Sequence, residues 1–117
     1  LIVASKSPLI EIGAHTVSHP NLDLLPYKEQ ELEILGSQNR LSNITGQDVR
    51  YFAYPRGAYN RDTLKLMEKL GFKAAFATTP RNLGKKPDFE LGRIGIYSSS
   101  LLKLHLKAIG IKRFFVL

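Results

Sequence analysis

The apolar and polar positions of this chain fall into blocks, and the longest block has helical spacing. Between Pro26 and Ile44, apolar residues such as Ile34 and Leu41 return at intervals of three, four or seven residues. Gly46 follows as a stop signal. This block predicts an amphipathic helix.

A second, shorter block shows the same period and better-defined ends. Asn60 can cap the first turn, and Leu64 and Met67 fall on one face. Gly71 stands just beyond Leu70, where a helix commonly ends in a left-handed residue. We therefore predict a helix from Asn60 to Leu70.

Between and beside these helices lie short runs rich in β-forming residues and bounded by glycine or proline. They predict four strands, over residues 9–12, 48–54, 72–78 and 93–97. Residues 79–87 hold two prolines, a glycine and two lysines and are expected to form a surface loop.

The last twenty residues allow two interpretations. Leu102, Leu104 and Leu106 alternate with polar residues, as in a half-exposed strand, but Leu106 and Ile109 also suit a helix. Three serines just before the run can cap a helix, so we favour the helix, followed by a short strand over residues 114–116.

Strands that alternate with helices predict an α/β fold with parallel strands and crossover helices. The layer is either an open sheet or part of a barrel, because a full eightfold barrel needs about 250 residues. We expect residues 1–117 to form a single domain. The chain does not begin with Met, so it is interpreted as a portion of a longer protein.

The composition limits the classes of binding partner and site that the chain can have. The net charge is +7 and the pI is near 9.8, which favours polyanions in general. The basic residues are spread along the chain without interleaved aromatic residues, so we expect no nucleic-acid partner. No apolar run is long enough to cross a membrane, and there is no cysteine for a disulfide or a thiolate metal site.

The residues best suited to chemistry are His15 and His19. They lie four residues apart between Gly13 and Pro20, so we predict a single turn at the end of a strand. Neutral imidazole is a common ligand for zinc, but two ligands do not complete a catalytic site. Two surface histidines in a polar loop are the alternative interpretation.

Neighbouring residues resolve this choice through a family resemblance. Residues 13–22, Gly-Ala-His-Thr-Val-Ser-His-Pro-Asn-Leu, resemble the metal-binding motif of the polysaccharide deacetylases, the NodB-homology carbohydrate esterases. Residues 51–60, Tyr-Phe-Ala-Tyr-Pro-Arg-Gly-Ala-Tyr-Asn, resemble the next motif of that family. Arg93-Ile94 resembles a late strand, so the resemblance covers roughly residues 10–97.

The resemblance implies an incomplete (β/α) barrel that hydrolyses acetyl groups on a polysaccharide such as chitin, poly-N-acetylglucosamine or peptidoglycan. It implies one divalent metal, zinc in the first place, with His15 and His19 as ligands. Thr16 is expected to support the turn by hydrogen bonding. A secreted or cell-envelope location follows from the family alone.

The second motif supplies the other candidate site residues. By resemblance, the backbone N–H of Arg56 is an oxyanion donor, and Pro55 and Gly57 shape its loop. Tyr54 and Tyr59 are candidates to line the sugar groove, with core packing as the alternative for Tyr54.

Several family features are missing. No Asp-Asp motif supplies a third ligand and a base, and neither Asp23 nor Asp88 stands in a matching context. Ala53 replaces the usual arginine, a charge that Arg93 is a candidate to supply. There is no tryptophan, and His105 is only a weak match to a late histidine.

We therefore expect a C–N hydrolase, a polysaccharide deacetylase, with little activity and weakened metal affinity in these 117 residues alone. The alternative is a degenerate, non-catalytic module that binds cell-wall glycan. Because an incomplete barrel exposes strand edges, a homo-oligomer is a further expectation.

Overall fold

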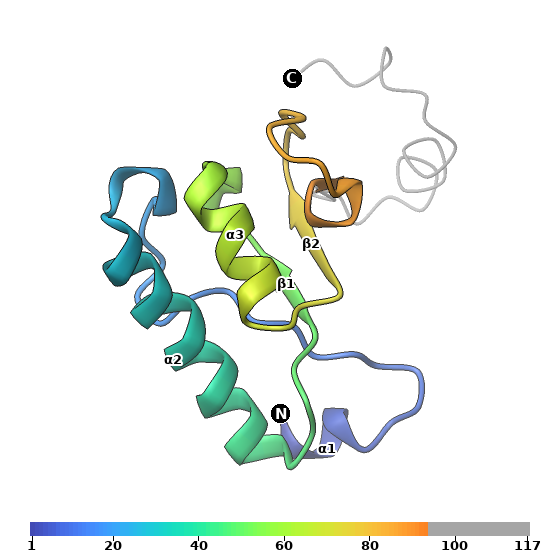
Figure 1. Ribbon diagram of the computed structural model, residues 1–117. Coiled ribbons are helices and arrows are strands. Elements are labelled where there is room, and N and C mark those ends of the chain that lie inside the picture. The colour runs from blue at the N-terminus through green and yellow to red at the C-terminus, as the bar shows by residue number, and fades with distance from the viewer. Residues whose placement is uncertain (94–117) are drawn as a thin grey trace, which may run out of the picture.

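The computed structural model describes residues 1–93 as a small parallel sheet with helices packed on it (Figure 1). The helices are α1 (Ile2–Ser5), α2 (Tyr27–Thr45) and α3 (Arg61–Lys69). The strands are β1 (Tyr51–Ala53), β2 (Ala74–Ala77) and β3 (Leu91–Gly92). Three single 3-10 turns connect them: η1 (Leu22–Leu24), η2 (Pro55–Gly57) and η3 (Pro87–Phe89).

The sheet has the order β1-β2-β3, with both pairs parallel. Phe52 lies opposite Ala75, and Phe76 lies opposite Leu91. On the free side of β1, Ala14 forms an isolated parallel bridge with Phe52. The segment that carries the histidines is therefore attached to the edge of the sheet by backbone pairing.

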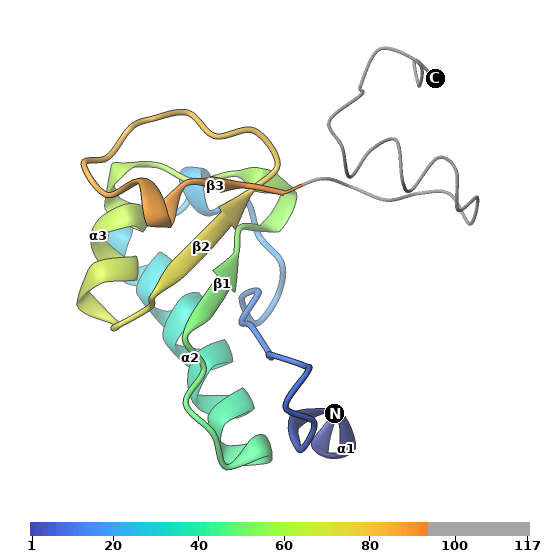
Figure 2. The same cartoon turned by 90° about the vertical axis from the view of Figure 1, so that its right-hand side faces the viewer.

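Helices α2 and α3 cover one face of the sheet, which places the core between them and the strands (Figure 2). Ile34 of α2, Leu66 and Met67 of α3, and Phe52 and Ala75 of the sheet are all buried. Each of the larger side chains removed from water in this way contributes roughly 1.5–3 kcal/mol. The core thus holds the strand ends, and the loops beyond them, in a fixed position.

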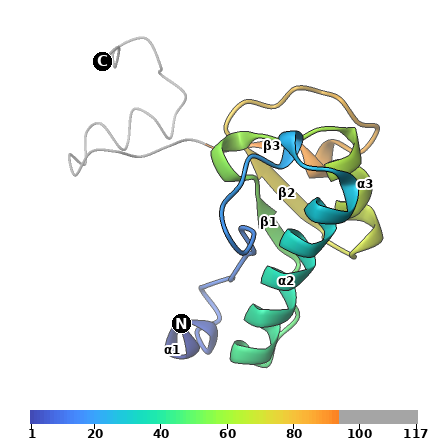
Figure 3. The ribbon, with the colours of Figure 1, turned by 90° about the vertical axis from the view of Figure 1, so that its left-hand side faces the viewer.

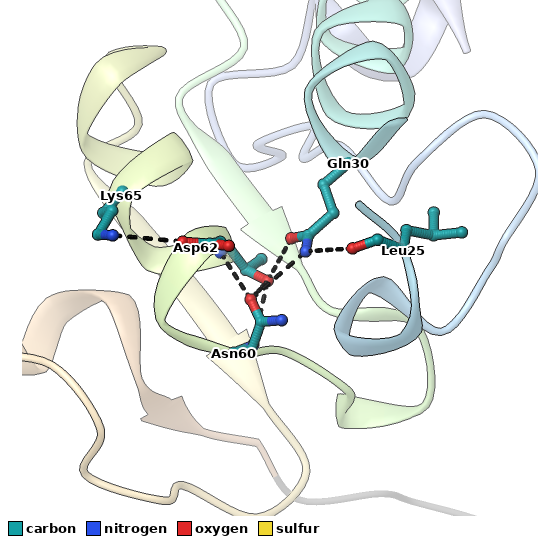
Figure 4. Close-up of polar contacts among 6 residues, drawn as sticks. Leu25, Gln30, Asn60, Asp62 and Lys65 are labelled. Carbon is teal, nitrogen blue, oxygen red and sulfur yellow. Dashed lines mark hydrogen bonds and ion pairs between the residues drawn. The ribbon is translucent and has the colours of Figure 1, made fainter. Parts of the chain in front are cut away.

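A buried polar network joins the start of α3 to α2 (Figure 4). Asn60 accepts from the backbone N–H of Thr63 at 3.0 Å, and the Thr63 hydroxyl accepts from the Asn60 N–H at 3.1 Å. The Gln30 amide accepts from the Thr63 hydroxyl at 2.6 Å and donates to the Leu25 carbonyl at 3.0 Å. The Asn60 cap predicted from the sequence is therefore confirmed, as one half of a capping box.

The two long helices confirm the predicted ranges within a residue or two. Leu64 and Met67 face the core, as the periodicity indicated. Gly46 and Gly71, the predicted helix stops, both have left-handed backbone, with φ of 68° and 76°. The sequence signals for these helices lie within or next to each helix, and the folded chain forms the helices that they predict.

The predicted strands at 48–54 and 72–78 are confirmed in part, as the shorter β1 and β2. The strand expected over residues 93–97 can be compared only at Arg93, because residues 94–97 lie outside the described part of the chain. There β3 ends at Gly92, and the Arg93 N–H donates to the Ala77 carbonyl at 2.9 Å. The loop predicted over residues 79–87 is irregular until η3 begins at Pro87.

The prediction of a strand over residues 9–12 is wrong. Leu9 is 93% exposed and Ile10 is 49% exposed, and pairing with β1 occurs only at Ala14. This apolar run lies outside the edge of the sheet, where no described strand offers it a ladder of backbone groups. The predicted helix and strand after residue 97, and His105, lie outside the described residues.

The chain belongs to the α/β class, and its parallel strands with crossover helices form part of a (β/α) barrel. The segment after α1 rises beside β1 to the carboxyl ends of the strands and then enters α2 (Figure 3). Carboxyl ends of parallel strands are where α/β proteins place their sites.

Candidate metal centre

His15 follows directly after the residue that bridges to β1, and its ring is fixed by β1 itself. Its Nδ1 lies 2.6 Å from the carbonyl oxygen of Ala53. Because a carbonyl can only accept, Nδ1 carries a proton in this contact, and in the neutral imidazole Nε2 then has the free lone pair. Metal-binding histidines are commonly oriented by a hydrogen bond of this kind.

His19 brings a second imidazole to the same place. The ring centroids of His15 and His19 lie 4.8 Å apart, at an interplanar angle of 66°. His19 is exposed and has a left-handed backbone with φ of 61°. The two histidines identified from the sequence are thus adjacent, although their role as metal ligands stays a prediction.

Thr16 closes the turn between the histidines. Its hydroxyl accepts from the backbone N–H of His19 at 3.1 Å and donates to the carbonyl of His15 at 2.5 Å. The expectation that Thr16 supports the turn by hydrogen bonding is confirmed.

Arg56 contributes more than its backbone. Its Nη1 donates to the His19 carbonyl at 3.0 Å and to the Asn21 side chain at 3.1 Å, so its guanidinium ties η2 to the histidine segment. The left-handed backbone of Arg56, with φ of 52°, is followed by Gly57 with φ of 69°. The sequence singled out the Arg56 N–H, and the contact of its side chain with Asn21 was missed.

Gly57 is required where the η2 loop meets the end of β2. A Cβ on Gly57 would lie 2.0 Å from Oγ1 and 3.1 Å from the backbone nitrogen of Thr78. Pro55, also predicted as a loop-shaping residue, is fully buried. Both residues shape the loop sterically, and neither offers a side chain to a sugar.

Tyr54 and Tyr59 lie in the core, so the prediction that they line a groove does not agree with the structure. Both are 0% exposed and their rings stack at 4.6 Å. Tyr54 donates to the Phe89 carbonyl at 2.8 Å. Burial, together with Tyr59 and Glu90 nearby, raises the pKa of Tyr54 far above its ordinary value, so this hydroxyl keeps its proton. The core interpretation of Tyr54 is the correct one.

Glu90 joins Tyr59 to the segment at Leu83 and Gly84. It accepts from the Tyr59 hydroxyl at 2.7 Å and from the backbone N–H groups of Leu83 and Gly84 at 2.8 and 2.9 Å. Burial alone would raise the pKa of Glu90, but these donors outweigh it and hold the pKa below its ordinary value. The buried carboxylate is therefore structural and ionised.

Arg93 contacts the residue that directly precedes η2. One guanidinium nitrogen lies 3.4 Å from the carbonyl oxygen of Tyr54, directly before η2. The side chain is thus close to the second motif, which is compatible with the proposed replacement of the family's arginine. That the charge of Arg93 acts on a substrate stays a prediction.

An open hollow of about 510 Å³ lies between β1 and the segment of residues 13–15, with His15 among its lining residues. Glu11, Ala14, Phe52 and Phe76 are among its lining residues. Within residues 1–93, no third His, Cys, Asp or Glu joins the two histidines in a group able to hold a metal. The donor set therefore fits a divalent metal in part, with two imidazoles and without an acidic ligand.

A residue that carried no motif signal also reaches this site. Glu33 of α2 accepts three hydrogen bonds from the turn between the histidines. Burial raises the pKa of Glu33, but hydrogen bonds from Ser18 and Val17 outweigh this and lower it overall. From the sequence, Glu33 was one of several glutamates on an amphipathic helix.

Solved structures with similar folds include deacetylases and a pseudoenzyme. The Streptococcus pyogenes deacetylase PplD in complex with acetate matches with a TM-score of 0.62 and 30% identity, over 72% of this chain and 38% of that chain. A CE4 family pseudoenzyme from Bacillus anthracis matches with a TM-score of 0.54 and 26% identity, over 56% of this chain and 23% of that chain.

Among curated proteins, the chitooligosaccharide deacetylase of Azorhizobium caulinodans is 36% identical over 73 residues, which are 61% of this chain and 35% of that protein. The chain thus spans only about a third of the length of this relative. In the part of the chain that the structure describes, no helix is both long and apolar enough to cross a membrane.

The family model for polysaccharide deacetylases matches residues 3–75, which is more than half of the chain and includes both motifs. With the paired histidines, the loop at Arg56 and the parallel sheet, this match leads to one conclusion. The chain belongs to the polysaccharide deacetylase family.

Proposed function

We propose that this chain is the histidine-bearing part of a metal-dependent enzyme that removes acetyl groups from a polysaccharide. The observation that carries the proposal is the pair of imidazoles at 4.8 Å, with His15 held by the Ala53 carbonyl so that its Nε2 is free. Family membership supports hydrolysis of an acetylated glycan as the reaction class.

His15 and His19 would hold the metal, with zinc as the first choice because imidazole suits it. A divalent metal supplies Lewis-acid chemistry, which activates water and polarises an acetyl carbonyl. The Arg56 N–H is proposed to donate to the oxygen that becomes negative during hydrolysis, a contribution of about 3–4 kcal/mol where such donors have been removed.

The chain's own residues also set a limit on activity. Within residues 1–93, no acidic residue completes a metal-holding group with the two histidines, and the sequence has no match to the Asp-Asp motif that would supply the family's base. A general base contributes about 10²–10⁴-fold to a rate. We therefore expect these 117 residues alone to bind metal weakly and to deacetylate chitooligosaccharides poorly.

The decisive experiment is a zinc titration by calorimetry on the wild-type chain and on the His15→Ala, His19→Ala double variant. One zinc ion per chain, lost in the double variant, is the expected result. Absence of zinc binding at micromolar concentrations, or equal binding in the double variant, would overturn the metal assignment. Rapid deacetylation by the chain alone would contradict the expected lack of a base.

A second candidate function is a non-catalytic module that binds glycan. The similarity to a CE4 family pseudoenzyme and the incomplete donor set favour it. Saturable binding of N-acetylglucosamine oligomers that is unchanged by EDTA supports this module. Binding that requires zinc and both histidines supports the enzyme.

A further inference from the structure

The turn between His15 and His19 has an unfavourable backbone at two points. Thr16 has φ of 67° and His19 has φ of 61°, and neither is a glycine. A β-branched residue such as Thr16 is rarely found in the left-handed region. Such residues persist only where the surrounding structure holds them in place.

Glu33 supplies much of that surrounding structure. Its Oε2 accepts from the backbone N–H groups of Val17 and Ser18, both at 2.9 Å. Its Oε1 accepts from the Ser18 hydroxyl at 2.7 Å. Both carboxylate oxygens thus hold the two residues that lie between the strained positions, and hydrogen bonds to a charged acceptor are stronger than neutral ones.

A second position on the same side of α2 also packs against the turn. Gly36 lies one helical turn after Glu33, and a Cβ placed on it would be 3.0 Å from Cγ2 of Val17. Glycine in the middle of a helix is unfavourable, and here its missing side chain lets Val17 approach the helix backbone. Glu33 and Gly36 therefore form one contact surface for residues 17–18.

We propose that Glu33 is a positioning residue for the His15–His19 pair. By holding the amides of Val17 and Ser18 against α2, it keeps the strained turn closed and the two imidazoles adjacent. The effect on metal affinity rests on the proposed function, whereas the effect on the turn itself does not. The residue acts through the turn and contacts neither ring.

The first test needs no metal. It compares the apo forms of the wild type, Glu33→Ala and Glu29→Ala. Two signals are measured: nuclear Overhauser contacts between the His15 and His19 rings, and hydrogen-exchange protection of the Val17 and Ser18 amides. Glu33→Ala should lose both signals. The matched control Glu29→Ala, on an exposed residue of the same helix, should keep them. Unchanged signals in a folded Glu33→Ala chain would overturn the proposal.

The second test is zinc affinity in the same chains, with Glu33→Gln added. The glutamine keeps an acceptor oxygen and the shape of the side chain, so it should retain most of the affinity. Glu33→Ala should weaken binding about tenfold or more, as for other residues that orient metal ligands. Equal losses in Glu33→Gln and Glu33→Ala would show that charge, and not position, is what matters.

The two tests separate the two claims. If the wild-type chain binds no zinc, the proposed metal function fails, and the ring contacts and amide protection of the apo protein still decide the role of Glu33. If zinc binds and Glu33→Ala binds it as tightly as Glu29→Ala does, the positioning role fails while the metal function stands. Circular dichroism checks that each variant is folded. If Glu33→Ala is not, Glu33→Asp takes its place: it keeps the charge but is one methylene shorter, so it should lose the ring contacts and the amide protection, and unchanged signals would overturn the proposal.

Discussion

The carbonyl oxygen of Ala53 lies 2.6 Å from Nδ1 of His15, so the last residue of β1 orients the ring of a residue 38 positions earlier. By the resemblance seen in the sequence, Ala53 stands where the family's second motif usually has an arginine. At this position the backbone, which does not depend on the side chain, provides the contact. The side-chain replacement therefore leaves the orientation of His15 intact.

This contact predicts the tautomer of His15. At a pH where the imidazole is neutral, the proton should reside on Nδ1, with Nε2 unprotonated. Nitrogen-15 NMR of the imidazole nitrogens measures this directly. A majority of the Nε2–H form in the native chain would contradict the assignment, and the fixed preference should disappear when the same sample is unfolded in urea.

Gly57→Ala should destabilise the chain by about 2–3 kcal/mol, because the new Cβ meets Thr78 and the backbone must stay left-handed. The matched control is Gly71→Ala, which has φ of 76° and no atom within 4 Å of the new Cβ. It should cost only about 1–2 kcal/mol. Urea unfolding measures both, and equal losses would rule out the steric term.

Asn60→Ala should cost about 1–2 kcal/mol, because it removes the acceptor for the Thr63 N–H and a partner of the Gln30 amide. Asn60→Asp keeps an oxygen at the cap and should lose much less. Thermal unfolding of the two variants provides the comparison. The cap would have no role in stability if Asn60→Ala matched the wild type.

Glu90 predicts a pH dependence of stability. Its folded pKa is lowered by donors from Tyr59, Leu83 and Gly84, whereas an unfolded glutamate titrates near about 4.3. The stabilisation is therefore fully present above the unfolded pKa and is lost as the pH falls through the folded pKa.

The check is the free energy of unfolding of wild type and Glu90→Gln as a function of pH. At neutral pH the glutamine should be less stable by about 1–3 kcal/mol, because its amide group faces backbone donors. The gap should narrow as the pH falls through the lowered folded pKa, where Glu90 in the wild type also gains a proton. A gap that is constant with pH would exclude an ionised Glu90.

The helices could be predicted from the sequence because their signals are local. Periodic apolar residues, the Asn60 cap and the two glycine stops all act within a few residues of the helix they define. The run at residues 9–12 misled for the opposite reason. Its apolar residues are compatible with a strand, but pairing depends on a neighbouring strand, and only Ala14 meets β1.

At the site, the sequence identified the two histidines and the loop at Arg56, because both belong to motifs. It could not separate a groove from a core for Tyr54 and Tyr59, since an aromatic residue beside a motif suits both places. Glu33 was out of reach, because its contact with the turn exists only once α2 is docked on the sheet.

The contacts that position the histidine pair join distant parts of the chain: His15 with Ala53, and Arg56 with His19. Closing loops of that length costs conformational entropy before any contact rewards it. The histidine pair should therefore form late in folding, after α2 and β1 have docked, and a peptide of residues 12–22 should not reproduce it. A ligand that binds only the assembled pair would in turn shift the folding equilibrium toward the native chain.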